Sequence, residues 1–448
     1  MFRSLSPVST TNSLSEAAAT PDFPGLESLD EGMGSCNSIE EEDFPPETKE
    51  KRPNLTAMEK TVKSEEVDGG FLVGNIFYNP KDILGKGSDG NIVFRGKFYD
   101  RDVAVKRVLK ENFTIREVEL LRESDRATEN VIRYHGVERC NICIYIALEL
   151  CDATLEDYVE GRYKDVKHDT RDVLKQMSEG LDHLHSLGIA HRDIKPTNIL
   201  ISVSKIKKGY TKIRIKLGDF GLCKKLKEGK RSLSRGSGAT GSPGWAAPEM
   251  QRKKTSINLL VDIFSLGCVF HYFITNGGHP FGEQDDRVGN ISRNNHDLTV
   301  LEAMNLFEER HLIFQMISQQ PVKRPPPYAL LAHPMFFPKE KKLDFIHAVS
   351  NRIGEGVNSD WRLEKYLEKN AKDVIGENWM KIDLLGKEVM EDLAMKKDQT
   401  FKPYVGTSIC SLIRAIRNKR EHYDKISVSA KKKYGTLPRN YLNFWISR

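Results

Sequence analysis

The chain has 448 residues, of which 39% are hydrophobic and 29% are charged. This length and composition allow more than one folded domain and exclude a wholly disordered chain. Its seven cysteines show no disulfide-framework spacing, which indicates a reducing compartment. The longest apolar stretch, residues 259–275, contains Asp262 and is predicted to be a buried helix. We therefore expect no membrane span in this chain and, as given, a cytoplasmic location.

The charges are unevenly distributed along the chain. Residues 1–70 carry 15 acidic and 6 basic side chains, and they are rich in Ser, Thr and Pro. This composition predicts a disordered acidic leader. Residues 401–448 carry 11 basic and 2 acidic side chains. Such a positive end suits a polyanionic partner, although charge alone favours the simpler interpretation of a solvated basic surface.

The folded part begins with strand-like runs at residues 91–94, 102–105 and 142–148, around one helical stretch near 116–122. After about residue 155 helical patterns dominate. The fold class predicted is therefore α+β, with a small sheet-rich lobe before a larger helical lobe. Cys140 and Cys143 form a CxxC without a second pair at zinc-site spacing, so core positions are expected for them.

A glycine-rich motif with the pattern GxGxxG occupies residues 85–90. Strand-like residues follow it, whereas a dinucleotide-binding fold would place a helix there. Glycines let the backbone approach phosphates, and a lysine on a following strand supplies positive charge. Glu117 lies on the helical stretch, where it can pair with that lysine. The predicted nucleotide-binding residues are Gly85, Gly87, Gly90, Val93, Lys106 and Glu117.

Three further motifs follow in order: HRDIKPTN at residues 191–198, DFG at 219–221 and APE at 247–249. Asp193 can accept the proton of a substrate hydroxyl. Asn198 and Asp219 offer the oxygen ligands that Mg²⁺ prefers when it bridges phosphates. Together the motifs predict phosphoryl transfer.

In this order and spacing the motifs resemble the eukaryotic protein-kinase family over about residues 78–337. The resemblance implies that ATP or ADP binds with Mg²⁺, and that Glu149 and Cys151 lie in the hinge that holds adenine. It also implies that Lys195 is the catalytic-loop lysine of serine/threonine-directed kinases, and that Glu249 forms a buried ion pair with Arg324. No catalytic position is degraded, so an active kinase is expected.

Residues 231–238, between DFG and APE, contain three serines among arginines and glycines. A phosphate on any of them would add nearly two negative charges, which local arginines could pair. An ordinary polar loop is the alternative, but the position favours regulatory sites. The predicted phosphorylation sites are Ser232, Ser234 and Ser237.

The basic C-terminal segment contains an amphipathic pattern over residues 408–418. Its predicted apolar face consists of Ile409, Leu412, Ile413 and Ile416. If the helix runs to His422, then Arg414, Asn418 and His422 form a stripe on the opposite face. Arg417 flanks that stripe and Tyr404 precedes the helix. Such groups can cut RNA without a metal, because the 2′-hydroxyl is the nucleophile and histidine exchanges protons near neutrality. From spacing alone, a solvated basic helix remains the simpler interpretation.

The pattern from Tyr404 to Tyr423, with GTLP at residues 435–438, resembles the kinase-extension nuclease domain of the inositol-requiring kinase/endoribonuclease family, the sensors of the unfolded protein response. The resemblance covers about residues 71–448. It implies a bilobal kinase over 71–337 followed by a mostly α-helical nuclease domain over 338–448. The nuclease residues that it implies are Tyr404, Arg417, Asn418 and His422.

The same resemblance implies an RNA stem-loop as substrate, with no DNA, and a homodimer or higher oligomer as the active state. Members of the family face the cytosol from the endoplasmic reticulum membrane. Three alternatives remain. The related 2-5A-dependent ribonuclease has ankyrin repeats and a degraded kinase, neither of which this sequence shows. The others are a nucleotide-gated scaffold that binds RNA without cutting it, and a plain kinase with a basic tail.

Overall fold

The described part of the chain covers most of the sequence after residue 60. The computed structural model describes residues 61–87, 90–124, 128–163, 168–205, 211–227, 229–230, 232–233, 241–252, 257–353, 360–369, 371–394 and 403–446. Residues 1–60 lie outside the described part of the chain. The predicted boundary of the leader at residue 70 is too late, because β1 (Ser64–Val67) already pairs with β2 (Gly70–Val73).

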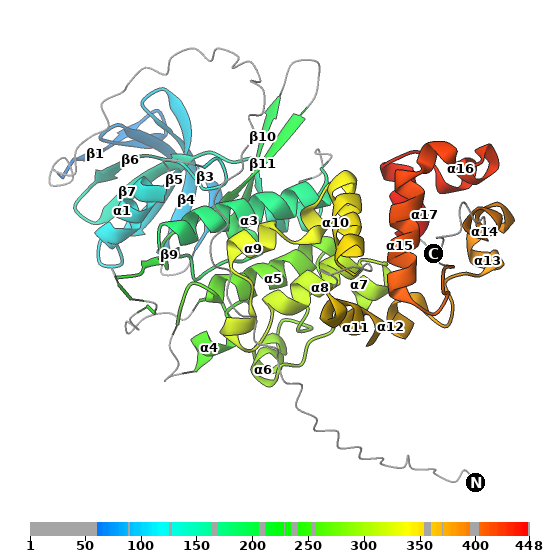
Figure 1. The fold of residues 1–448 in the computed structure, drawn as a ribbon. Helices are drawn as coiled ribbons and strands as arrows, with labels where there is room; N and C mark the ends of the chain where they lie inside the picture. Colours follow the sequence, from blue (N-terminus) through cyan, green and yellow to red (C-terminus); the bar gives the residue numbers. More distant parts are fainter. Residues whose placement is uncertain are drawn as a thin grey trace, which may run out of the picture. The chain divides into compact units, whose positions relative to one another are not determined.

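The first lobe is a seven-stranded antiparallel sheet with the strand order β1-β2-β3-β4-β5-β7-β6 (Figure 1). Its remaining elements are β3 (Ile76–Lys86), β4 (Ile92–Phe98), β5 (Arg101–Leu109), α1 (Ile115–Ser124), β6 (Tyr134–Arg139) and β7 (Cys143–Glu149). The predicted strands and helix are thus confirmed. Cys143 is buried and Cys140 packs against the same apolar cluster, so the expected core positions are confirmed too.

The second lobe is mainly helical, and short strands position its loops. The strands are β8 (Ala153–Thr154), β9 (Ile189–Ala190), β10 (Ile199–Lys205), β11 (Thr211–Leu217) and β12 (Lys224–Lys225). The helices are α2 (Leu155–Val159), α3 (Thr170–Ser186), α4 (Pro248–Gln251), α5 (Val261–Ile274), α6 (Arg287–Arg293), α7 (Thr299–Ala303), α8 (Phe307–Met316) and α9 (Pro327–Leu331). Single 3-10 turns are η3 (Pro196–Asn198), η4 (Pro321–Lys323) and η5 (Pro334–Phe336). The apolar run at 259–275 forms α5, which is buried along nearly its whole length, as predicted.

The described residues after Pro338 form helices and a second apolar core. The elements are α10 (Lys339–Arg352), α11 (Trp361–Lys369), α12 (Ala371–Ile375), α13 (Ile382–Leu385), α14 (Lys387–Ala394), α15 (Ile409–Glu421), η6 (Tyr423–Lys425), α16 (Val428–Tyr434) and α17 (Arg439–Ile446). Aromatic side chains dominate their core, among them Trp379, Tyr434, Tyr441 and Trp445. The predicted α-helical extension is confirmed.

The helix α15 differs from its predicted pattern in two ways. Of the four residues of the predicted apolar face, Ile416 is buried and the other three are half-buried. Ser411, Ala415 and Lys419 are buried as well, and Lys419 lies against Asp392 of α14, while α10, α11 and α12 also contact this helix. The helix also ends at Glu421, so His422 is its C-cap residue and not part of a helical stripe.

Among the described residues, no helix combines the length and the apolar character that a membrane span needs.

Candidate functional site

A buried lysine joins the sheet to the DFG segment. Lys106 Nζ, on β5, donates to Glu117 Oε1 of α1 at 2.6 Å and to Asp219 Oδ1 at 2.8 Å. Burial alone would lower the pKa of Lys106, but the carboxylates of Asp219 and Glu117 outweigh burial and hold that pKa above its ordinary value. Burial would raise the pKa of Asp219, but Lys106 outweighs it and lowers this pKa to about 2. The structure therefore brings the three groups together. The sequence predicted the pairing of Lys106 with Glu117 and did not predict the contact of Lys106 with Asp219.

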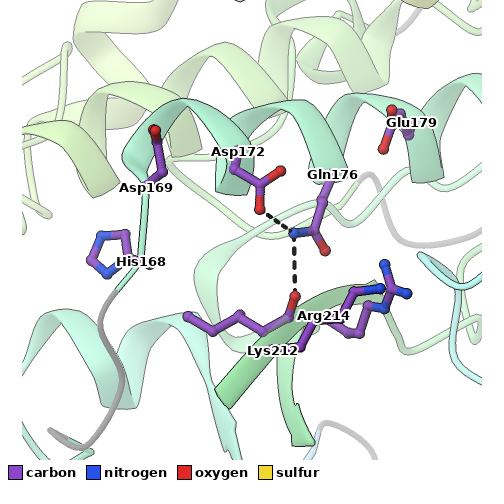
Figure 2. A pocket seen from close by; sticks show the side chains of 8 residues that line it. His168, Asp169, Asp172, Gln176, Glu179, Lys212 and Arg214 are labelled. Atoms are coloured by element: carbon purple, nitrogen blue, oxygen red, sulfur yellow. Dashed lines mark hydrogen bonds between the residues drawn. The ribbon is translucent and has the colours of Figure 1, made fainter. Parts of the chain in front are cut away.

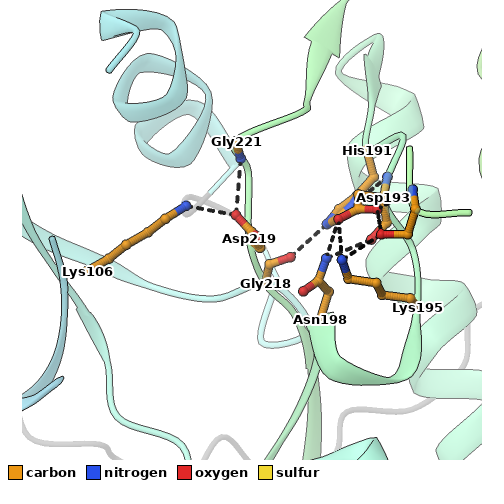
Figure 3. Close-up of polar contacts among 9 residues, drawn as sticks. Lys106, His191, Asp193, Lys195, Asn198, Gly218, Asp219 and Gly221 are labelled. Atoms are coloured by element: carbon orange, nitrogen blue, oxygen red, sulfur yellow. Dashed lines mark hydrogen bonds and ion pairs between the residues drawn. The ribbon is translucent and has the colours of Figure 1, made fainter. Parts of the chain in front are cut away.

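The carboxylate of Asp193 lies at the centre of a polar cluster (Figure 3). Its Oδ1 accepts from the backbone N–H of Ser242 at 3.0 Å and from the Ser242 hydroxyl at 2.7 Å. Its Oδ2 accepts from Asn198 Nδ2 at 2.9 Å and pairs with Lys195 Nζ at 2.9 Å. Lys195 Nζ also donates to Ser242 Oγ at 2.6 Å. The cluster holds an acceptor carboxylate in a fixed orientation, which suits proton removal from a hydroxyl.

A buried aspartate on α5 positions the loop that carries Asp193. Asp262 accepts from the backbone N–H groups of His191 at 2.8 Å and Arg192 at 2.7 Å, and His185 Nε2 lies 2.9 Å from the same carboxylate. His191 Nε2 in turn bonds to Gly218 O at 2.8 Å, next to the DFG segment. The roles of Ser242, His191 and Asp262 were not predicted from the sequence. Two signals were present: His191 begins the HRDIKPTN motif, and Asp262 places a charge within an apolar run.

Two oxygen-bearing side chains could hold a divalent cation between them and bound phosphates. Asn198 directs its amide nitrogen to Asp193, with a second bond to Asp193 O at 2.8 Å, so its amide oxygen is left as the ligand atom. Asp219 accepts from Lys106 and from Gly221 N through Oδ1. Within the described residues, no three His, Cys, Asp or Glu side chains gather as a metal cage. This donor set fits Mg²⁺, which takes few protein ligands and relies on phosphate oxygens and water.

The glycine-rich motif lies on the turn between β3 and β4. Gly85 pairs with Val93, and Val93 pairs with Lys106, so the strand register aligns all three. Gly87 N donates to Asn91 O at 2.8 Å. Gly90 has φ +75°, a conformation that side chains strain and glycine adopts freely. Ser88 and Asp89 of this motif lie outside the described residues.

The predicted hinge follows β7, which ends at Glu149. The Glu149 carboxylate lies 3.0 Å from Lys216 Nζ of β11, and Lys216 is buried. Cys151 is half-buried, and burial raises the pKa of its thiol to about 12. The thiol therefore stays neutral at neutral pH.

The predicted phosphorylation sites are only partly described. Ser232 is exposed, and Leu233 beside it is buried and pairs with Ile257. Ser234 and Ser237 lie outside the described residues. Lys224, on β12 in the same sequence segment, lies near two other cations. Arg116 Nη2 donates to Lys225 O at 3.4 Å, and burial, followed by Arg192 and Arg116, lowers the pKa of Lys224.

In the helical extension, three predicted residues form a chain of hydrogen bonds. Arg417 donates through Nε at 3.1 Å and through Nη2 at 2.8 Å to Asn418 Oδ1. Asn418 Nδ2 donates to the hydroxyl of Tyr404 at 3.2 Å. The guanidinium of Arg414 lies 5.1 Å from the centre of the Tyr404 ring. Burial raises the pKa of Tyr404, although Asn418 and Arg414 oppose the shift, so the phenol is neutral at neutral pH.

The fourth predicted nuclease residue lies one helical turn farther along. His422 is exposed, and its backbone N–H donates to Asn418 O at 3.1 Å. The structure therefore brings Tyr404, Asn418 and Arg417 into direct contact and places His422 beside them, at the end of α15.

A buried ion pair holds α15 against α14. Lys419 Nζ lies 2.9 Å from Asp392 Oδ2 and donates to Asp392 O at 2.7 Å. The hydroxyl of Tyr434, on α16, donates to the same carboxylate at 3.0 Å. The pairing of Lys419 with Asp392 and Tyr434 was not predicted, because a lysine in a basic segment is expected to be a solvated surface cation.

A separate polar hollow of about 290 Å³ lies between α3 and β11 (Figure 2). Gln176 Nε2 bridges its walls, with bonds to Asp172 Oδ2 at 2.8 Å and Ile213 O at 3.3 Å. The hollow is lined by His168, Asp169, Asp172, Gln176, Glu179, Lys212, Ile213 and Arg214. None of the predicted site residues lies in this lining.

Comparison with known proteins matches two consecutive regions of the chain to two families. Residues 78–336 match the protein kinase domain family, and residues 342–448 match the family described as Ribonuclease 2-5A. Serine/threonine-protein kinase/endoribonuclease IRE2 of Homo sapiens is 42% identical over 384 residues, which is 84% of this chain and 40% of that protein. Serine/threonine-protein kinase/endoribonuclease ire-1 of Caenorhabditis elegans is 40% identical over 395 residues, 86% of this chain and 39% of that protein.

A third relative covers nearly the whole chain. The sensor for unfolded proteins in the ER ire1 of Schizosaccharomyces pombe is 34% identical over 469 aligned residues, 98% of this chain and 43% of that protein. The chain thus spans about two fifths of the length of these curated relatives.

Proposed function

The chain belongs to the family of serine/threonine-protein kinase/endoribonucleases, and from this membership we propose that it is a bifunctional enzyme that phosphorylates itself and cuts RNA in the unfolded protein response. The observation that carries the proposal is the presence of two intact constellations in one chain. One surrounds Asp193 in the kinase domain, and the other joins Tyr404, Asn418 and Arg417 in the extension.

In the kinase reaction, Asp193 accepts the proton of the substrate hydroxyl, and Lys195 neutralises the charge beside it. Lys106 holds the nucleotide phosphates and is itself oriented by Glu117. Mg²⁺, when bound, offsets the phosphate charge, and Asn198 and Asp219 would hold it. The glycine-rich turn covers the phosphates of ATP or ADP, and the backbone from Glu149 to Cys151 holds the adenine.

Autophosphorylation of Ser232, Ser234 and Ser237 is the proposed switch. The closeness of Arg116, Arg192 and Lys224 supports it, because these like charges repel one another and a phosphoserine of the same activation segment could pair with them. The phosphorylated, nucleotide-bound kinase would then favour a homodimer or a higher oligomer.

In the nuclease reaction, Arg417 and Asn418 position the phosphate and a base. Tyr404 assists removal of the 2′-hydroxyl proton, which passes to solvent water, and His422 donates a proton to the leaving 5′-oxygen. The 2′-oxygen attacks the adjacent phosphorus, so one product ends in a 2′,3′-cyclic phosphate and the other in a 5′-hydroxyl. This chemistry needs no metal-bound water. The substrate proposed is an RNA stem-loop cut within its loop, on the cytosolic side of the endoplasmic reticulum.

A second candidate function is general RNA decay of the 2-5A-dependent type, which the match of residues 342–448 favours. The Lys106–Glu117 and Lys106–Asp219 contacts favour the first candidate, because they indicate a kinase domain able to transfer phosphate.

The test uses the full chain and a labelled RNA hairpin, with and without ADP and Mg²⁺, and a separate incubation with labelled ATP and Mg²⁺ measures autophosphorylation. We expect a cut in the loop that depends on nucleotide and a cyclic phosphate at the new end. Cleavage of unstructured RNA at the same rate would favour general decay. Absence of both cleavage and autophosphorylation would overturn the proposal.

A further inference from the structure

The helix α10 contacts α15 through one stripe of polar side chains. The three pairs are Asp344 with Arg420 at 2.6 Å, His347 with Glu421 at 3.4 Å, and Asn351 with Arg417 at 3.0 Å. Residues 344, 347 and 351 are three and four positions apart, so they lie on one face of α10. This face meets the same turns of α15 that carry the proposed nuclease residues.

Asn351 contacts one of those residues directly. Arg417 Nη1 donates to Asn351 Oδ1, while Nε and Nη2 donate to Asn418 Oδ1. The planar guanidinium is therefore held from two directions. Among the described residues, these contacts leave one N–H on each terminal nitrogen of Arg417, which is the pair of donors that a phosphate accepts. Loss of the Asn351 bond would allow rotation about the last side-chain torsions of Arg417.

The position of Asn351 depends in turn on the kinase domain. α10 begins at Lys339, directly after the residues that match the kinase family. Lys342 on its first turn is buried, and its ammonium pairs with Glu308 of α8. One rigid helix therefore connects a kinase-domain carboxylate to the guanidinium of the proposed nuclease site.

We propose that Asn351 is a positioning residue of the nuclease, which sets the orientation of Arg417 from a helix anchored to the kinase domain. The inference rests on the proposed function of Arg417, Asn418 and Tyr404. Asn351 does not touch the RNA in this proposal. It fixes the group that does, so it acts on the rate of the chemical step more than on RNA affinity.

The test measures kcat and KM for hairpin cleavage by the full chain with ADP and Mg²⁺. Asn351→Ala should lower kcat roughly tenfold, as expected for one lost hydrogen bond to a charged group, and leave KM nearly unchanged. Asn351→Asp keeps an acceptor for Arg417 and should retain the wild-type kcat. Asn351→Lys places a cation against Arg417 and should lower kcat more than Asn351→Ala. Glu340→Ala, an exposed position on the first turn of α10, is the control and should change neither constant.

A wild-type kcat in both Asn351→Ala and Asn351→Lys would overturn the inference. Arg417→Ala separates this failure from that of the proposed function. If Arg417→Ala is inactive while the Asn351 variants are normal, only the positioning role is wrong. If Arg417→Ala itself cleaves normally, the assignment of the nuclease site is wrong. Autophosphorylation should be equal in all of these variants, which also confirms that they fold.

Discussion

Arg324 and Glu249 form a two-pronged ion pair at 2.6 and 2.8 Å, although they are 75 positions apart in the chain. Both side chains are almost completely buried. Arg324 Nη1 also donates to Leu260 O at 3.0 Å, directly before α5. The pair thus connects the end of the activation segment to the helix that begins with Asp262, and through Asp262 to the catalytic loop.

Breaking this pair from one side should be costly. Glu249→Ala leaves the Arg324 guanidinium buried without its carboxylate, so unfolding free energy should fall by about 3–5 kcal/mol. Lys175 and Glu179 form an exposed pair on α3, and Glu179→Ala should cost less than about 1 kcal/mol. Urea unfolding of both variants measures the difference. Equal midpoints would contradict the structural role of the buried pair.

Removal of Asp219 should separate the two activities. Asp219→Ala deletes a proposed Mg²⁺ ligand and the partner of Lys106, so autophosphorylation should fall below detection. RNA cleavage should persist where nucleotide binding is retained, since the nuclease site lies in another domain. Asp285→Ala, an exposed aspartate of the kinase domain, is the control. Incorporation of labelled phosphate at the wild-type rate by Asp219→Ala would show that the assignment is wrong.

The proton donor of the nuclease is tested at the end of α15. His422→Ala should lower RNA cleavage by at least about a hundredfold, because a positioned acid contributes about 10²–10⁴-fold. RNA affinity should stay nearly constant, since the basic surface remains. His311→Ala, an exposed histidine of α8, should cleave normally. The proposal is falsified if His422→Ala cuts the hairpin at the unmodified rate, or if EDTA stops cleavage by preformed dimers.

Phosphate mapping tests the activation segment. Active protein incubated with ATP and Mg²⁺ should carry phosphate on Ser232, Ser234 or Ser237. The triple alanine variant should incorporate much less and form fewer dimers at a given concentration, because the phosphates no longer pair with the cations near Arg192. Phosphate confined to residues 1–70 in peptide mass spectra would contradict this prediction.

Stability should fall at acid pH because of a half-buried histidine. Burial, followed by the neighbouring His311, lowers the pKa of His333 from 6.5 to about 4, and His333 Nδ1 accepts from Met335 N at 3.2 Å. The folded state therefore resists protonation that the unfolded state accepts. The stabilising effect is complete above pH 6.5 and is lost as the pH falls towards 4.

His333→Asn removes that titration but can still cap the following turn. Its melting temperature should depend less on pH between 6.5 and 4 than that of the unmodified protein, as scanning calorimetry can measure. An identical pH dependence in the two proteins would show that His333 does not titrate in this range.

The kinase site was predictable because its residues lie in short motifs whose spacing is fixed by local turns. Lys106 follows the glycine-rich motif and Asp219 belongs to DFG, whereas Glu117 was placed by a helical pattern. The structure joins all three, although the contact of Lys106 with Asp219 was not predicted. Ser242 and Asp262 were missed, since their roles depend on contacts with Asp193 and its loop that no local pattern encodes.

The extension was less predictable for a physical reason. Periodicity assumes one apolar neighbour on one side, whereas α15 has several helical neighbours. Its buried positions therefore include Lys419, which the sequence presents as a solvated cation. The residue at which α15 ends, before His422, could not be predicted either, because helix ends depend on capping contacts and not on the periodicity of the sequence.

The buried pair between Lys419 and Asp392 makes the placement of α15 an all-or-none choice. A shift of the helix by one residue would bring Asn418 or Arg420 to the position opposite Asp392, and neither could reproduce the bonds that Lys419 makes to its carboxylate and its carbonyl oxygen. A sliding helix would also leave a charge without compensation in an apolar interior. The ion pair therefore fixes both the axial position and the rotation of α15. Arg417, Asn418 and His422 are thereby held in one orientation relative to the rest of the helical extension.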